Sequence, residues 1–207
     1  MDDPILARLM ALRFQYNKIA LQELEKGLKI RLAAVPTLQA KEAALRLEVK
    51  RLHHQLDQAE ASYRQALQDA GRAGELWEEF DTDLVQIREV STRWEKLAGV
   101  RFQVLETITF QDPPVAMIHQ PLWLAEGIPL LQAAVRQHVR CHYLRRQMDL
   151  LDYERKKTTQ KLNLYMKVQI PEHEDAIRRI KRFLEDEENL AKAAQKIVKK
   201  KKEQLAR

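Results

Sequence analysis

Apolar residues recur at alternating steps of three and four along the first part of the chain, and only Arg31 and Glu42 interrupt them with charge. The positions are Leu21, Leu24, Leu28, Arg31, Val35, Leu38, Glu42, Leu45, Val49, Leu52, Leu56, Ala59, Tyr63, Ala66 and Ala70. A repeat of 3.5 residues keeps one helix face toward a partner and favours a left-handed supercoil. At 1.5 Å per residue this helix is about 75 Å long. The pattern predicts a rod.

A second stripe of the same spacing closes the chain, with Arg155, His173 and Glu187 as its polar interruptions. Two such stripes in one chain predict an antiparallel coiled coil within that chain, which needs no partner concentration. A homodimer through the first stripe is the alternative. The apolar and small positions of the second stripe are Leu144, Met148, Leu151, Thr158, Leu162, Tyr165, Ile170, Ile177, Ile180, Leu184, Ala191, Ala194 and Val198.

The two stripes also suggest a register for this pairing. Matching them places Leu24 near Ala194 or Ile197, and Leu45 near His173 or Ile177. Two prolines, Pro36 and Pro171, lie inside the stripes. Proline lacks the backbone donor and clashes with the preceding turn, so each should kink or split its helix. The pattern resumes in register after both, which favours kinks.

The middle of the chain follows a different pattern. Gly71 and Gly74 should end the first helix, and residues 75–97 are expected to form a shorter helix with Leu76, Phe80, Leu84 and Ile87 on one face. Residues 100–110 are rich in β-branched and aromatic side chains and predict a strand, with a second short strand near residues 115–118. Residues 123–134 then lead into the last helix. We therefore expect an all-α fold of three segments: the first shaft helix (1–70), a middle segment with a short helix and a β-hairpin (71–125) and the second shaft helix (126–207).

Composition narrows the classes of function. The net charge is +6, but acidic residues are interspersed among the basic ones and 32% of all residues are charged. This is typical of a solvated coiled-coil surface, and nucleic-acid binding is a minor option. One cysteine excludes an intrachain disulfide and suits a reducing compartment. We expect no membrane-spanning segment, since no apolar run approaches eighteen residues, and no secretory signal at a start that carries Asp2 and Asp3.

Few side chains suggest chemistry. His138, Cys141 and His142 share a helical face, but no third ligand segment is evident and four arginines flank them, so a metal site is not expected. His53 and His54 point about 100° apart on a helix and cannot chelate together. No phosphate-binding glycine loop, nucleophile triad or zinc-protease motif appears. We expect no catalytic, cofactor-binding or metal-binding residues.

Two charged stretches on the last helix have two interpretations. Arg178, Arg179, Lys181 and Arg182 precede residues 185–188, which are all acidic. Pairs such as Arg178 or Arg182 with Glu185 often only solvate a helix face. In a lone helix pair, however, such bands are also available to a surrounding partner, and both interpretations stay open. The lysines of residues 199–202 suit the negative end of a helix dipole.

Two terminal blocks carry a specific resemblance. Residues 28–51 (LKIRLAAVPTLQAKEAALRLEVKR) resemble the N-terminal helix of the D subunit of the rotary V/A-type ATPases, in its bacterial form. Residues 158–171 (TTQKLNLYMKVQIP) resemble the C-terminal motif of that family, and residues 172–190 resemble the segment that follows it. The tripeptide of residues 98–100 is similar to the entry of the family's hairpin. The resemblance extends from about Phe14 to Lys202.

The resemblance implies a central rotor shaft whose terminal helices enter a ring of alternating A and B subunits, where ATP reacts. It implies that the middle segment binds the F subunit and that the base docks on a funnel-like subunit above the membrane ring. The chain would then be a non-catalytic part of the complex, cytoplasmic and peripheral on the inner face of the membrane. Arg178, Arg179, Lys181 and Arg182 would face the ring, and a strand presenting Val100, Phe102, Val104, Ile108 and Phe110 would contact the F subunit. A generic coiled-coil scaffold or tether unrelated to rotation is the alternative. The sequence leaves open whether the complex works as a pump or a synthase, and whether the coupling ion is the proton or sodium.

Overall fold

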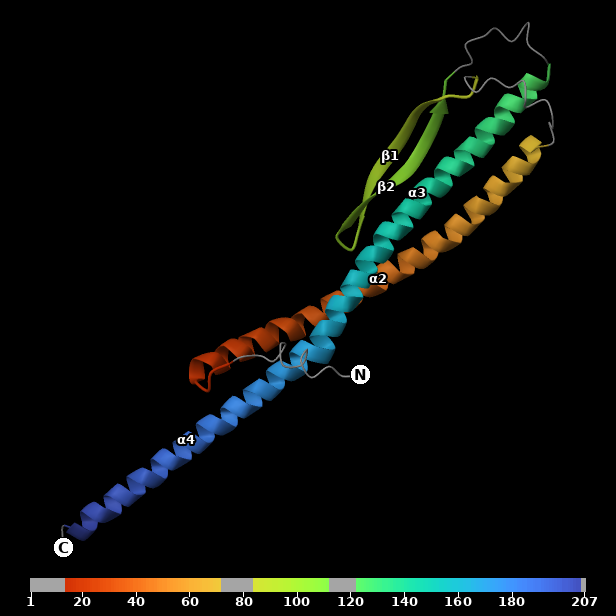
Figure 1. Cartoon of the computed structure of the whole chain (residues 1–207). Coiled ribbons are helices and arrows are strands. Elements are labelled where there is room, and N and C mark those ends of the chain that lie inside the picture. Colours follow the sequence, from red (N-terminus) through yellow and green to blue (C-terminus); the bar gives the residue numbers. More distant parts are fainter. Residues whose placement is uncertain (1–13, 72–83, 112–121, 206–207) are drawn as a thin grey trace. The chain divides into compact units, whose positions relative to one another are not determined.

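The computed structural model describes residues 14–71, 84–111 and 122–205. Its elements are α2 (Lys18–Gly71), β1 (Ile87–Leu97), β2 (Val100–Phe110), α3 (Leu122–Leu164), the π-helical turn η4 (Tyr165–Gln169) and α4 (Ile170–Leu205) (Figure 1). Long helices pair antiparallel, and a two-stranded antiparallel hairpin lies between them in the sequence, which confirms the expected fold class. The first helix ends at Gly71 and β2 has the bounds predicted for the strand.

The chain divides into two compact units, and the three consecutive segments expected from the sequence stay a prediction. The terminal unit combines the residues up to 40 with those from 158 onward, and the middle unit spans residues 41–157. Each unit therefore takes one part of α2 and pairs it with a part of the chain far away in sequence.

Burial along α2 follows the predicted stripe. Each of its positions is buried or half-buried, including the charged Arg31 and Glu42. Glu42 is only 6% exposed, and its carboxylate accepts hydrogen bonds from the Arg46 guanidinium at 2.8 Å. The charge of Glu42 is therefore compensated one turn away on the same helix, which allows a carboxylate to lie in an apolar seam.

In the terminal unit α2 packs antiparallel against α4, but in a register that differs from the prediction. Leu24 packs with Ala176, Ile177 and Ile180, and not with Ala194 or Ile197. The predicted register was therefore wrong by roughly five helical turns. An apolar heptad repeat is nearly self-similar, so sliding one stripe along the other preserves most apolar contacts and the heptads alone cannot fix the offset.

Polar contacts distinguish the observed register of the terminal unit. The Arg31 Nε donates to the Gln169 Oε1 at 2.8 Å, and its Nη1 donates to the Gly27 carbonyl at 2.9 Å. A Cβ on Gly27 would lie 3.1 Å from the Arg31 Nη1 and 3.4 Å from the Nε2 of His173. The small residue and the polar side chains therefore fit one another only where Gly27 lies opposite His173.

Near Pro171 the helix changes its hydrogen-bonding pattern. The five-residue turn η4 precedes α4, and the Ile170 N–H bonds to the Tyr165 carbonyl, five residues back. The Gln169 carbonyl accepts a hydrogen bond from the His173 Nδ1 at 2.7 Å, so this ring nitrogen carries the hydrogen. Proline supplies no N–H, and the π turn accommodates it between two α-helices. At Pro36, by contrast, α2 continues as one helix.

The hairpin of the middle unit corrects a second prediction. Residues 87–97, expected to end a short helix, form β1, which pairs with β2 from Leu97↔Val100 to Ile87↔Phe110. The two-residue turn between the strands has positive φ at both Ala98 (48°) and Gly99 (84°), as the type I′ hairpin turn requires. Residues 75–83 of the expected helix and the expected strand at 115–118 lie outside the described residues.

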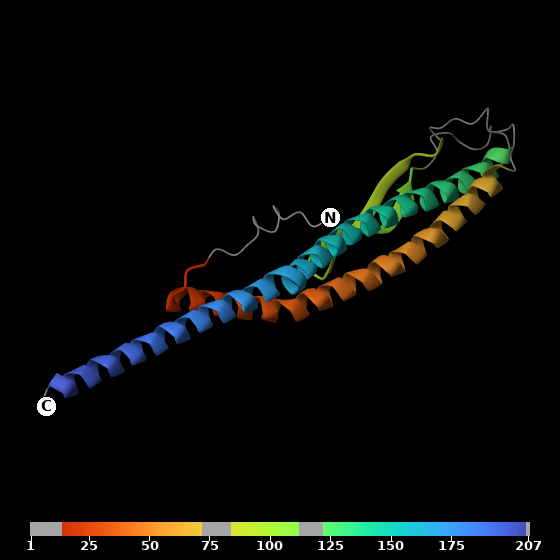
Figure 2. The same cartoon turned by 60° about the horizontal axis from the view of Figure 1, so that its bottom comes forward.

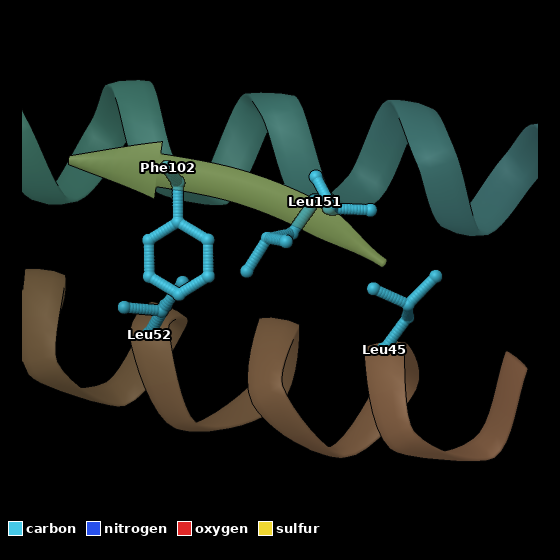
Figure 3. Packing of buried hydrophobic residues seen from close by; sticks show 5 residues of the cluster. Leu45, Leu52, Phe102 and Leu151 are labelled. Atoms are coloured by element: carbon cyan, nitrogen blue, oxygen red, sulfur yellow. The ribbon is translucent and has the colours of Figure 1, made fainter. Parts of the chain in front are cut away.

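The hairpin lies along α3 and closes the core of the middle unit (Figures 1 and 2). Figure 3 shows Phe102 of β2 over Leu52 of α2, with Leu151 of α3 beside them on the side of Leu45, which is one heptad from Leu52. Leu45, Leu52 and Leu151 are at most 1% exposed. Burying each such side chain contributes about 1.5–3 kcal/mol. Leu45 thus packs near Leu151. The register predicted from the sequence, which placed Leu45 near His173 or Ile177, was wrong here too.

Candidate functional site

Of the three candidate metal ligands on α3, Cys141 is buried, whereas His138 and His142 are exposed. Cys141 is buried with Leu56 and Ala59, and this burial raises the pKa of its thiol. The His138 ring lies 5.3 Å from the Tyr63 ring. Within the described ranges no three His, Cys, Asp or Glu residues gather in a way that could hold a metal. In those same ranges no helix is apolar and long enough to span a membrane.

Four exposed cations lie close together on α4, and we call them the basic cluster: Arg178, Arg179, Lys181 and Arg182. Its four side chains are exposed and lie outside the seam, which is formed here by Ile177 and Ile180 at 9% and 0% exposure. The Lys181 Nζ lies 2.7 Å from the Glu25 Oε1 of α2, and the Arg178 Nη2 lies 3.3 Å from the Asp175 Oδ1. Arg178 thus pairs one turn back, and not forward to Glu185 as the sequence suggested.

Aromatic rings flank the basic cluster. The Tyr16 ring lies 5.1 Å from the Phe183 ring, and both line a shallow groove with Arg179 and Arg182. Exposed charge pairs such as those of Arg178 and Lys181 contribute at most about 1 kcal/mol each. The cluster therefore offers weak, charge-based contacts to a neighbour and adds little to the stability of the helix pair.

Beyond Leu184 the second stripe faces solvent. Its positions Ala191, Ala194 and Val198 are all exposed, and so are the neighbouring Leu190 (71%) and Ile197 (59%). The helix α2 begins at Lys18, so within the described terminal unit none of its residues lies alongside Ala194 or Val198. The Glu188 carboxylate lies 2.8 Å from the Lys192 Nζ, which lowers the pKa of Glu188. This end of α4 is amphipathic and carries the lysines of residues 199–202.

The predicted partner strand is divided between the core and the surface. Val100 and Phe102 are 8% and 5% exposed and face the chain's own core, so they cannot contact a partner directly. Val104, Ile108 and Phe110 are half-buried. The Arg136 guanidinium stacks over the Phe110 ring at 5.1 Å from its centroid. The strand therefore stabilises the middle unit with its first residues and offers only part of its apolar surface outward.

A groove that sequence reasoning missed runs between the hairpin and α3. We call it the hairpin groove; its lining residues are Trp94, Arg101, Phe102, Gln103, Tyr143, Arg146, Gln147 and Leu150. The Gln147 Nε2 donates to the Gln103 carbonyl at 2.7 Å and fixes the strand to the helix at this point. The signal in the sequence would have been a strand at residues 87–97, on which the large side chain of Trp94 is exposed.

Charged pairs also occur on α3 near the end of the middle unit. The Asp152 carboxylate lies 2.9 Å from the Lys156 Nζ and 2.7 Å from the Arg155 Nη2. The hydrogen bond from Lys156, followed by that from Arg155, lowers the pKa of Asp152. These pairs follow i,i+4 and i,i+3 spacing and stabilise the helix locally.

Together, the described residues define a class of protein in which long helices pair and a β-hairpin is inserted between them in the sequence. Its candidate sites are two exposed surfaces, the basic cluster and the hairpin groove. Residues 20–200 match the model of a family described as the D subunit of ATP synthase. Three similar proteins are each named as the D subunit of a V-type ATP synthase. That of Borreliella burgdorferi is 26% identical over 190 residues, covering 90% of this chain and 94% of the relative. That of Chlamydia felis is 25% identical over 196 residues (92% and 91%), and that of Chlamydia pneumoniae 26% over 157 residues (73% and 75%).

The family model spans most of the chain, and the relatives are covered over most of their own length. The chain belongs to the family of ATP synthase D subunits.

Proposed function

We propose that this chain is the central rotor shaft of a V-type ATPase and couples ATP hydrolysis or synthesis in a ring of A and B subunits to ion translocation in the membrane. The family match over residues 20–200 carries this proposal. The paired helices α2 and α4 support it, because coiled-coil packing gives a stiff element that can transmit torque. In this role the chain has no catalytic residues of its own, and ATP reacts in the ring.

The proposed location follows from the role. The chain is cytoplasmic and peripheral on the inner face of the membrane, with its base docked on a funnel-like subunit above the membrane ring. The F subunit binds at the hairpin of the middle unit. The inner wall of the A/B ring faces the basic cluster. A shaft must break and remake its ring contacts as it turns, and exposed charges suit this because each interaction is weak.

Reconstitution tests the role directly. Purified A and B subunits of the same organism are mixed with this chain and the F subunit, and ATP-driven rotation of a bead on the chain is recorded. Assembly and rotation support the proposal. If the chain neither assembles with the ring nor binds the F subunit, it is a scaffold or tether unrelated to rotation.

A charge reversal tests the contribution of the basic cluster. Changing Arg178, Arg179, Lys181 and Arg182 together to Glu should impair ring assembly or rotation while the helix pair stays folded, because all four side chains are exposed. Reversing four exposed cations on the helices of the middle unit, away from the hairpin (Lys50, Arg64, Lys156 and Lys157), changes the net charge equally and is the matched control. A cluster variant that assembles and rotates like the parent would show that these cations only solvate the helix.

A further inference from the structure

We propose that the hairpin groove binds a segment of the F subunit that presents one large apolar side chain flanked by carboxylates. This inference rests on the proposed function, since it takes the partner to be the small subunit of the same complex. It adds to the proposed contact at the hairpin the particular groove and the chemistry of the segment that the groove would hold.

Two large apolar side chains of the groove are exposed. Trp94 is 65% exposed and Leu150 is 39% exposed, while Phe102 between the hairpin and α3 is 5% exposed. Tryptophan is enriched among the residues that dominate binding energy at interfaces, and apolar groups gathered at a surface mark interaction sites. The groove therefore suits one apolar anchor that covers Trp94 and Leu150.

The charge at the groove is one-sided. Arg101 and Arg146 line it and are exposed, and within the described residues neither guanidinium has a carboxylate partner. Other arginines of the middle unit are paired: the Arg93 Nη2 lies 2.6 Å from the Glu95 Oε1, and the Arg145 Nη2 lies 2.6 Å from the Glu60 Oε1. Charge complementarity across interfaces thus favours an acidic segment in this groove.

The walls of the groove are fixed before any partner arrives. The hydrogen bond from Gln147 to the Gln103 carbonyl joins β2 to α3, and Phe102 is part of the core cluster with Leu52 and Leu151. A groove that does not need to order on binding loses less conformational entropy, so even a small contact area can give a specific complex.

Two sets of variants separate the apolar and charged parts. Trp94→Ala removes the anchor site, and the double variant Arg101→Glu/Arg146→Glu reverses the charge. The charge-matched control is Lys50→Glu/Arg64→Glu on the exposed face of α2, and Arg101→Lys/Arg146→Lys keeps the charge of the groove. Calorimetric titration with the purified F subunit of the same organism gives the Kd at low and at physiological salt. Circular dichroism and the urea midpoint confirm that each variant is folded.

We expect the charge reversal to weaken binding at least about tenfold and to reduce its salt dependence. Trp94→Ala should weaken it roughly 30-fold, as for a central tryptophan of an interface. The α2 control and the lysine variant should stay within about threefold of the parent, since surface changes outside the contact have small effects.

Several outcomes overturn the inference. One is unchanged binding of the F subunit by both groove variants, and another is an equal loss in the α2 control, which would indicate a general charge effect. If the groove variants lose binding to a 20-nucleotide single strand and still bind the F subunit normally, the groove is assigned to nucleic acid. If the parent chain assembles with the A/B ring and the F subunit but the groove variants do so equally well, only this inference fails. If the parent assembles with neither, the proposed function itself fails.

Discussion

Replacing Leu45 with alanine tests the packing of the middle unit most directly. Leu45 is 0% exposed and belongs to the cluster that α2, α3 and β2 form with Leu52, Leu151, Val100 and Phe102. Truncating a fully buried leucine removes its transfer free energy and leaves a cavity, and costs about 2–5 kcal/mol of unfolding free energy. That is a large part of the roughly 5–15 kcal/mol that stabilises a typical domain.

Leu47 is the matched control, two residues further along the same helix and 72% exposed. Leu47→Ala makes the same chemical change with the same change in helix propensity, and should alter the unfolding free energy by no more than about 0.5 kcal/mol. Urea unfolding of the full chain, followed by circular dichroism at 222 nm, measures both variants. Equal losses in the two variants, or a loss in Leu45→Ala below about 1 kcal/mol, would refute the assignment of Leu45 to the core.

Three further predictions concern the register, the hairpin and pH. A double-mutant cycle between Leu24→Ala and Ile180→Ala should show a coupling energy of at least about 0.5 kcal/mol, while the cycle between Leu24→Ala and Ala194→Ser should show none; the reverse would restore the register expected from the heptads. Ala98→Asn should stabilise the chain by up to about 1 kcal/mol in urea unfolding, because asparagine tolerates the positive φ of 48° better than alanine does. Because the pKa of Asp152 lies below its unfolded value, its ion pairs stabilise the fold at neutral pH, and this contribution is lost as the pH falls below about 4. Asp152→Asn should therefore make unfolding less steeply dependent on pH in that range, and an unchanged pH profile of the urea midpoint would contradict the pairing.

The helices were predictable because their signal is periodic and long. The stripe from Leu21 to Ala70 has the burial that its spacing predicts, and β2 has its predicted bounds. The strand β1 was missed because apolar residues of the 75–97 segment also fit a helical face. Residues 87–97 form a strand because they pair with β2 across the turn at Ala98 and Gly99. Such pairing depends on a contact between two segments and is not visible in a local pattern.

The candidate sites were less predictable than the fold. Sequence spacing left the role of the basic cluster open, and its four side chains are exposed outside the seam of Ile177 and Ile180. It could not show that Val100 and Phe102 face the chain's own core, because which face of a strand is buried depends on what packs against it. The hairpin groove could not be found at all without β1, since Trp94 lies on that strand.

The polar residues of the terminal seam explain how a repetitive pattern can still specify one structure. Apolar heptads stabilise any register in which one stripe packs against the other. A half-buried Arg31, by contrast, lowers the free energy of unfolding unless its guanidinium donates hydrogen bonds to acceptors. In the observed register it finds the Gln169 Oε1 at 2.8 Å and the Gly27 carbonyl at 2.9 Å. Shifting α4 by a heptad would keep the apolar contacts and lose the contact to Gln169. Gln169 is the last residue of the π turn η4, which precedes Pro171. Arg31 and His173, the polar interruptions of the two stripes, therefore lie where the polar contacts fix the alignment of the helices.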